Sequence, residues 1–218
     1  VFTNLYQTFI GINYSPSDVG YYSRANQMQS AASVATSMAL GQVIFPAFSP
    51  YQDDKETLLV VHRKIIRMSM FLIMPLMIGL IIIAKPLFLF LLTEKWADSI
   101  LYFQLLSIIG ILYPIIVQNY NLFRITGHTG LHLKLEIFKY SLTVIAILLT
   151  YRHGIVLLIV GQIAVYIIST SVASFFAGKL IGFRLIDQFI DLLPIILVSF
   201  AMGFIVFLVG RINIVSNL

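Results

Sequence analysis

Long apolar runs with almost no charge are the feature that most constrains this chain. The 218 residues are 59% hydrophobic and 11% charged, whereas soluble domains contain about 25% charged residues. A water-soluble fold cannot bury that much apolar surface. Because a bilayer-spanning helix needs about 20 mainly apolar residues, the sequence predicts a polytopic, all-α integral membrane protein.

Apolar runs of spanning length predict about seven transmembrane helices in a single transmembrane domain covering residues 1–218. They are expected near residues 1–12, 24–49, 69–92, 100–123, 135–151, 154–177 and 190–210. The first is short, and the chain begins at Val1 without a basic or signal-peptide-like segment. We therefore expect the chain to be part of a longer protein.

The distribution of basic residues predicts the orientation of these helices. Alternate loops and helix ends divide the Lys and Arg residues into sets of nine and five. The nine are Lys55, Arg63, Lys64, Arg67, Arg124, Lys134, Lys139, Lys179 and Arg184, and the five are Arg24, Lys85, Lys95, Arg152 and Arg211. Because cytoplasmic loops accumulate positive charge, the side with nine is expected to be cytoplasmic.

Composition and motifs argue against several classes of function. The chain has no cysteine, which removes thiolate nucleophiles and thiol-based metal sites. Its net charge of +5 is scattered between apolar runs, so nucleic acid is not an expected partner. The four histidines supply no metal site, since His128 and His132 lack carboxylate partners at ligand spacing, and no catalytic constellation is present. We expect no metal, no cofactor and no enzymatic activity.

Polar residues inside the predicted spans indicate a hydrophilic cavity, because lipid cannot satisfy them. Amides suit sugar hydroxyls, and arginine suits a phosphate or diphosphate. The candidate cavity-lining residues are Gln7, Arg24, Asn26, Gln29, Gln118, Asn119 and Arg124. Either arginine can instead anchor a helix at the membrane surface, and any of the amides can instead join two helices through a hydrogen bond.

Two further segments each allow two interpretations. Pro114 lies in a predicted span shortly before Gln118 and Asn119, so it is a candidate hinge or a simple packing irregularity. The basic residues of 62–67 are expected either to hold a helix at the lipid surface or to recruit an anionic lipid diphosphate.

Several short motifs between residues 18 and 140 resemble those of Wzx-type bacterial polysaccharide (O-antigen and lipopolysaccharide) flippases. The motifs are DVGYYSRA at 18–25, FPAFS at 45–49, QDD at 52–54, AKPL at 84–87, LTEKW at 92–96 and LKLEI at 133–137. Members of this family belong to the MOP superfamily of MATE-like exporters and have two similar lobes around a central cavity. The chain resembles the later, C-terminal lobe.

The resemblance implies a transporter that moves an undecaprenyl-diphosphate-linked oligosaccharide to the outer leaflet by alternating access. Its implied setting is the bacterial cytoplasmic (inner) membrane. The implied partners are this lipid-linked substrate, membrane lipids, a first lobe of the same chain and polysaccharide assembly proteins. Two alternatives remain. A MATE-like drug antiporter would need a carboxylate within a span, and a glycan polymerase or acyltransferase would need catalytic residues in a large outer loop.

Overall fold

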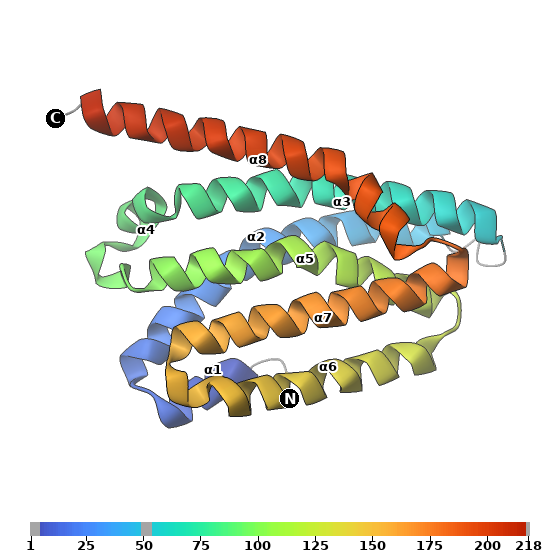
Figure 1. Ribbon diagram of the computed structural model, residues 1–218, viewed down its shortest axis with the longest axis horizontal. Coiled ribbons are helices and arrows are strands. Elements are labelled where there is room, and N and C mark those ends of the chain that lie inside the picture. Colours follow the sequence, from blue (N-terminus) through green and yellow to red (C-terminus); the bar gives the residue numbers. More distant parts are fainter. Residues whose placement is uncertain (1–4, 49–53, 217–218) are drawn as a thin grey trace.

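The computed structural model describes residues 5–48 and 54–216, with side chains described over 5–34 and 54–210. Within these residues the chain is helical and has no strand (Figure 1). The α-helices are α1 (Leu5–Asn13), α2 (Pro16–Phe48), α3 (Lys55–Ile82), α4 (Ala84–Leu92), α5 (Ser99–Ile125), α6 (Thr129–Thr150), α7 (Ile155–Ile181) and α8 (Leu185–Ser216). The short 3-10 helices η3 (Glu94–Trp96) and η4 (Tyr151–His153) lie in connections.

Helix α5 lies at the centre of the bundle. It packs against α2, α3 and α7, while α8 packs on α3 and α6 packs on α7 (Figure 1). Buried α5 side chains such as Phe103, Leu106 and Phe123 fill the space between these neighbours. Apolar residues on several faces of α5 allow it to be covered on several sides.

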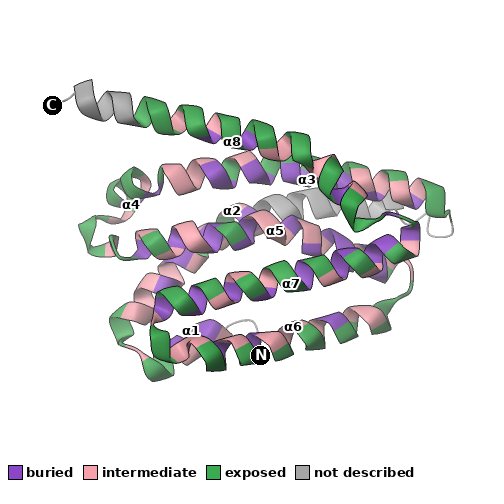
Figure 2. Cartoon of the chain, viewed as in Figure 1, coloured by how far each residue is buried: buried purple, intermediate pink, exposed green. Residues whose placement is uncertain are grey.

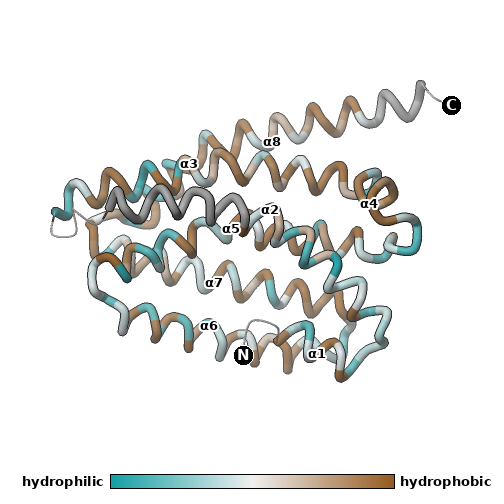
Figure 3. Tube along the Cα trace, turned by 180° about the vertical axis from the view of Figure 1, so that it is seen from behind, coloured by the Kyte–Doolittle hydropathy of each residue, from teal (hydrophilic) through white to brown (hydrophobic). Residues whose placement is uncertain are grey.

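The outside of the bundle is apolar, as expected for helices that contact lipid. Large exposed side chains include Phe90 at 87%, Phe71 at 65% and Phe204 at 63% exposure. Figure 2 shows exposed residues along the outer faces of α6 and α8, and Figure 3 shows that hydrophobic residues predominate along α3, α7 and α8. This arrangement, with apolar residues facing both the core and the surroundings, is typical of a membrane bundle.

Four helices within the described residues are long and apolar enough to span a bilayer. They are α3, α5, α7 and residues 185–210 of α8. The chain is therefore a multi-pass helical membrane protein, but the predicted count of seven spanning helices is not supported. Helix α6 carries Lys134, Glu136 and Lys139, and α1 has only 9 residues.

The helix predicted over 69–92 begins earlier and is interrupted at Ile83, although α4 ends at Leu92 as predicted. Helix α3 begins at Lys55, where the Asp54 side chain accepts hydrogen bonds from the backbone N–H groups of Glu56 and Thr57. It ends at Ile82, and α4 follows from Ala84. Proline has no N–H and clashes with the carbonyl four residues earlier. Pro86 therefore disfavours a helix that continues through Ile82, and the chain starts a new one.

The connections gather at two ends of the bundle (Figure 1). At one end, the Tyr14 hydroxyl donates to the Tyr151 carbonyl, and the Tyr21 and Trp96 rings meet edge to face. At the other end lie the α5–α6 and α7–α8 turns, where Gly127 and Gly182 have positive φ. Successive long helices therefore run between these two ends in alternating directions, as was assumed when the basic residues were divided into two sets. The assignment of the second end to the cytoplasm stays a prediction.

The α7–α8 corner depends on a glycine in the last turn of α7. A Cβ atom at Gly178 would lie 2.0 Å from the Phe183 carbonyl oxygen, while the Phe183 N–H donates to the Gly178 carbonyl at 2.9 Å. We expect Gly178→Ala to displace α8 and to lower the free energy of unfolding by about 1–3 kcal/mol. Thermal unfolding of the solubilised protein measures this.

The matched control is Gly130→Ala in α6, where a Cβ atom would meet no other atom within 4 Å. This variant should unfold at or slightly above the wild-type temperature, because alanine favours a helix more than glycine does. Equal unfolding temperatures for the two variants would contradict the tight corner.

Candidate functional site

A polar cavity of about 240 Å³ lies between α1, α2, α5 and α7. Its lining consists of Tyr6, Gln7, Tyr22, Asn26, Gln29, Ser30, Ser33, Val34, Ile109, Tyr113, Gln162 and Tyr166. Typical ligand pockets measure about 300–1,000 Å³. This cavity has room for a small polar group or one part of a larger ligand.

Helix α2 provides one continuous face of this cavity. Tyr22, Asn26, Gln29 and Ser33 are spaced by three or four residues, so they lie along the same side of the helix. The Gln29 amide donates to Ser33 Oγ at 2.8 Å within this face. The Tyr22 hydroxyl donates to Gln162 Oε1 on α7 at 3.0 Å. These two bonds fix the positions of the side chains that form the cavity wall.

Other polar groups in the wall are free for a ligand. Neither Gln7 nor Asn26 makes a hydrogen bond within the described part of the chain, and both are partly exposed. The Tyr6 hydroxyl is buried and has no described partner. Two amides and a phenol therefore supply both donors and acceptors, as recognition of sugar hydroxyls requires.

The structure brings together three of the predicted cavity residues, namely Gln7, Asn26 and Gln29. The prediction from sequence missed the four tyrosines, Tyr6, Tyr22, Tyr113 and Tyr166, because they were counted as apolar. Their hydroxyls and flat rings suit a ligand that is polar at its edges and apolar on its faces. Tyr22 lies four residues before Asn26 and therefore on the same face of the helix, a spacing that could have identified this tyrosine from the sequence.

Arg24 lies on another side of α2 and does not line the cavity. Its guanidinium group lies 5.0 Å from the centre of the Trp96 ring and donates to Gln27 Oε1 at 3.2 Å. These contacts match the interpretation of Arg24 as an anchor at the end of a helix. A contact with a substrate phosphate stays a prediction.

The remaining predicted residues lie away from the cavity, on α5. Arg124 is exposed near the end of that helix. Asn119 is fully buried and donates to Ser174 Oγ on α7 at 2.9 Å. Gln118 is also buried and accepts a bond from Asn121 at 3.4 Å. The geometry of Asn119 fits the alternative role of an interhelical hydrogen bond.

Pro114 lies inside α5, one residue after Tyr113 of the cavity wall. Because proline has no N–H, the carbonyl of Gly110 loses its usual helical donor. Gly110 also allows close contact, since a Cβ atom there would lie 2.5 Å from Gln29 Nε2. A weakened turn of α5 is thus located beside the cavity, although a hinge motion at Pro114 stays a prediction.

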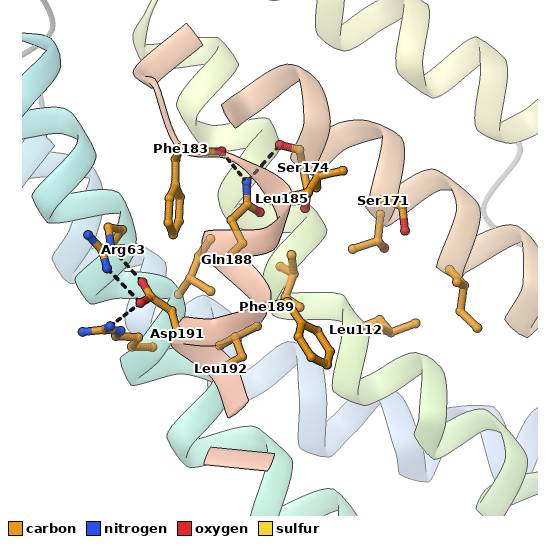
Figure 4. Close-up of a pocket in the computed structure, with 15 residues that line it drawn as sticks. Arg63, Leu112, Ser171, Ser174, Phe183, Leu185, Gln188, Phe189, Asp191 and Leu192 are labelled. Atoms are coloured by element: carbon orange, nitrogen blue, oxygen red, sulfur yellow. Dashed lines mark hydrogen bonds and ion pairs between the residues drawn. The ribbon is translucent and has the colours of Figure 1, made fainter. Parts of the chain in front are cut away.

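A second pocket, of about 180 Å³, lies among α3, α5, α7 and α8 (Figure 4). On one side of it, Arg63 of α3 makes two hydrogen bonds to the Asp191 carboxylate of α8, at 2.7 and 2.8 Å. Arg67 also donates to this carboxylate. Gln188 donates to the carbonyls of Ser174 and Phe183 at 3.1 and 3.0 Å. These contacts fasten the first turns of α8 to α3 and α7.

Asp191, a carboxylate within a spanning helix, is not among the site residues predicted from the sequence. The structure places it in the second turn of α8, with its side chain 8% exposed. Arg63 and Arg67 are four residues apart in α3, as are Asp187 and Asp191 in α8, and this matched spacing was the available signal. An antiporter carboxylate must be free to bind a cation, whereas two arginines occupy Asp191.

A metal site is not found among the described residues, where no group of three His, Asp or Glu side chains could hold an ion. Such a cluster would be needed for the usual metal coordination by protein ligands. His62 is buried in α3 with its Nε2 atom unpaired by any described group. It has no carboxylate partner among the described ion pairs.

The apolar bundle with a polar cavity between its helices defines a multi-pass membrane protein with a hydrophilic internal site. A family model described as a polysaccharide biosynthesis protein matches residues 1–101. The chain is also 27% identical over 173 residues to the lipopolysaccharide biosynthesis protein WzxC of Escherichia coli (strain K12), covering 75% of this chain and 35% of that relative.

A membrane protein in the cps region of Klebsiella pneumoniae is 39% identical over 69 residues, which cover 32% of this chain and 14% of that relative. No solved structure matches the chain significantly. These comparisons confirm the predicted resemblance to Wzx-type polysaccharide flippases. The matched part spans about a third of the length of WzxC.

Labelling with a thiol reagent tests whether water reaches the polar cavity. Because the chain has no cysteine, one introduced thiol reports on one position. We expect a membrane-impermeant maleimide to modify Asn26→Cys in intact membranes, because this position lines the cavity. It should not modify Phe204→Cys, which lies on the apolar surface of α8. Equal labelling of both in intact membranes, after correction for labelling in detergent, would contradict a hydrophilic cavity.

Proposed function

We propose that this chain forms part of a membrane transporter that exports the oligosaccharide precursor of a bacterial surface polysaccharide. The observation that carries the proposal is a cavity lined with amides, tyrosines and serines in a chain similar to WzxC. In a bundle whose exterior is apolar, a polar cavity between helices is suited to bind a glycan.

The chemistry of the cavity suits binding without catalysis. Gln7 and Asn26 each offer both donors and acceptors, so they match hydroxyl groups in any orientation. The tyrosine rings provide flat apolar surfaces for the C–H faces of a sugar. The described cavity lining contains no carboxylate, histidine or basic residue, the side chains that most often act as a general acid or base. We infer transport and not an enzymatic reaction.

The full transport cycle is part of the same proposal. The glycan is carried on undecaprenyl diphosphate, its sugars enter a cavity shared with the first, N-terminal lobe of the same protein, and the lipid tail stays in the bilayer. The chain is then the C-terminal, MATE-like lobe of a transporter in the bacterial inner membrane. Alternating access exposes the cavity first to the cytoplasmic side and then to the outside.

An export assay tests the role of the cavity. A strain that lacks its own flippase is complemented with the complete reading frame containing these residues, and surface polysaccharide is measured. We expect Asn26→Ala to lower export by roughly two- to tenfold at unchanged membrane abundance, because it removes a side chain that is free to bind a sugar hydroxyl.

The matched control is Asn13→Ala at the exposed end of α1, where the amide donates only to the Phe9 carbonyl. Its export should equal that of the wild type. If both asparagine variants export normally, the cavity is not the path of the glycan. If the complemented strain gains drug resistance but no polysaccharide, the protein is a drug exporter.

The predicted phosphate contacts are tested in the same strain. If Arg24 and Arg124 meet a phosphate during transport, Arg24→Ala and Arg124→Ala lower export without lowering membrane abundance. If their role is anchoring alone, export per molecule stays at the wild-type level. Normal export in both variants would remove them from the substrate path.

Replacement of Pro114 by alanine tests the proposed hinge in α5. Pro114→Ala restores an N–H to the central helix and should straighten or stiffen it. We expect higher thermal stability together with slower export. Pro194→Ala in α8 is the comparison, because residue 194 does not line the polar cavity. Equal export by the wild type and Pro114→Ala would contradict the hinge.

A further inference from the structure

A basic hollow lies on the outward face of α3, separate from the polar cavity. It measures about 370 Å³ and is lined by Leu59, Val60, Arg63, Lys64, Arg67 and Met68. We call it the α3 hollow. Half of its lining residues are cations and half are apolar, which is the composition expected where a charged headgroup meets hydrocarbon.

Among the described residues, Asp191 is the carboxylate that pairs directly with cations of the α3 hollow; Asp187, whose charge also acts on Arg63, is paired with Arg184. Asp191 of α8 pairs with Arg63 and Arg67. Together with Asp191, these two arginines also line the second pocket. Lys64 is exposed and makes no ion pair within the described part of the chain. The hollow therefore has an excess of about two positive charges.

The surface beside the α3 hollow is apolar. From Met68 to Ile82, α3 contains no charged residue. Met68, Phe71 and Leu72 are 55%, 65% and 51% exposed, and their spacing from Lys64 continues the same helix face. A ligand with its anion on the cations can therefore place hydrocarbon chains along this stripe.

We propose that the α3 hollow binds the phosphate of an anionic glycerophospholipid from the surrounding bilayer. Lys64 and Arg67 contact the phosphate. The Arg67 guanidinium group can donate two parallel N–H hydrogen bonds to it. The acyl chains lie against Met68, Phe71 and Leu72. The hollow shares no residue with the polar cavity, so the site is distinct from the proposed glycan path and does not depend on the export function.

The bound lipid also competes with α8 for the same arginine. Asp191 receives a hydrogen bond from Arg67, whose side chain is 49% exposed, and two more from Arg63. A phosphate on Arg67 weakens the Arg67 contact and leaves the bidentate Arg63 contact in place. Removal of the Asp191 charge should therefore strengthen lipid binding.

Lipid titration of the solubilised chain tests the site, with phosphatidylglycerol as the anionic probe and phosphatidylcholine as the neutral one. We expect selective retention of phosphatidylglycerol, detected by native mass spectrometry. Lys64→Gln should weaken its affinity by about fivefold, since one basic residue near a membrane surface contributes about this factor. Lys64→Arg should preserve the affinity.

The matched control is Lys134→Gln, which removes the same charge from an exposed lysine at the same end of the bundle, outside the hollow. It should bind as the wild type does. Asp191→Asn should bind phosphatidylglycerol more tightly, a gain that general loss of structure would not produce. Thermal unfolding of each variant verifies that it is folded.

Three results would overturn the proposal. The first is equal binding of phosphatidylglycerol and phosphatidylcholine by the wild type. The second is an equal loss of affinity in Lys64→Gln and Lys134→Gln. The third is complete displacement of phosphatidylglycerol by an equal concentration of inorganic phosphate or of farnesyl diphosphate, which would assign the hollow to a soluble phosphate or to an isoprenoid carrier.

Discussion

The structure depends on one constraint, which is that a polar group inside a bilayer must be paired within the protein or face a water-filled space. The backbone satisfies it by forming helices throughout the described residues. Most side chains follow it through placement, although some buried polar atoms such as His62 Nε2 have no partner among the described residues. Apolar residues such as Phe71 and Phe204 face outward, while amides such as Gln29 and Asn119 are buried between helices.

Helix α7 links the polar cavity to the pocket beside Asp191. Gln162, Tyr166, Thr170 and Ser174 recur every four residues and so form one stripe of that helix. The first two line the polar cavity and the last two line the pocket beside Asp191. Helix α5 likewise contributes residues to both sites, so a change in the shape of α5 near Pro114 would alter the two together.

Helix α8 is the least buried of the four spanning helices found within the described residues. Only 11% of its spanning window is buried inside the bundle, against 39% to 44% for α3, α5 and α7. Its first turns are held by Asp191 and Gln188. Beyond them, Gly203 approaches α3 so closely that a Cβ atom would lie 2.6 Å from the Ile78 side chain. An ionic cluster, one small residue and the packing of Leu192, Ile195 and Ile196 on α3 thus position a helix whose surface is mostly left to lipid.

The sequence by itself determined the class of the protein, the approximate position of most helices and the family it resembles, because apolar length and local motifs are one-dimensional properties. It also identified Gln7, Asn26 and Gln29, which share a cavity. Tertiary structure decided the rest, since a helix has several faces and only packing selects the one that meets a neighbour. That choice placed Arg24 on Trp96 and Asn119 on Ser174, and it joined Arg63 to Asp191 across 128 residues of chain.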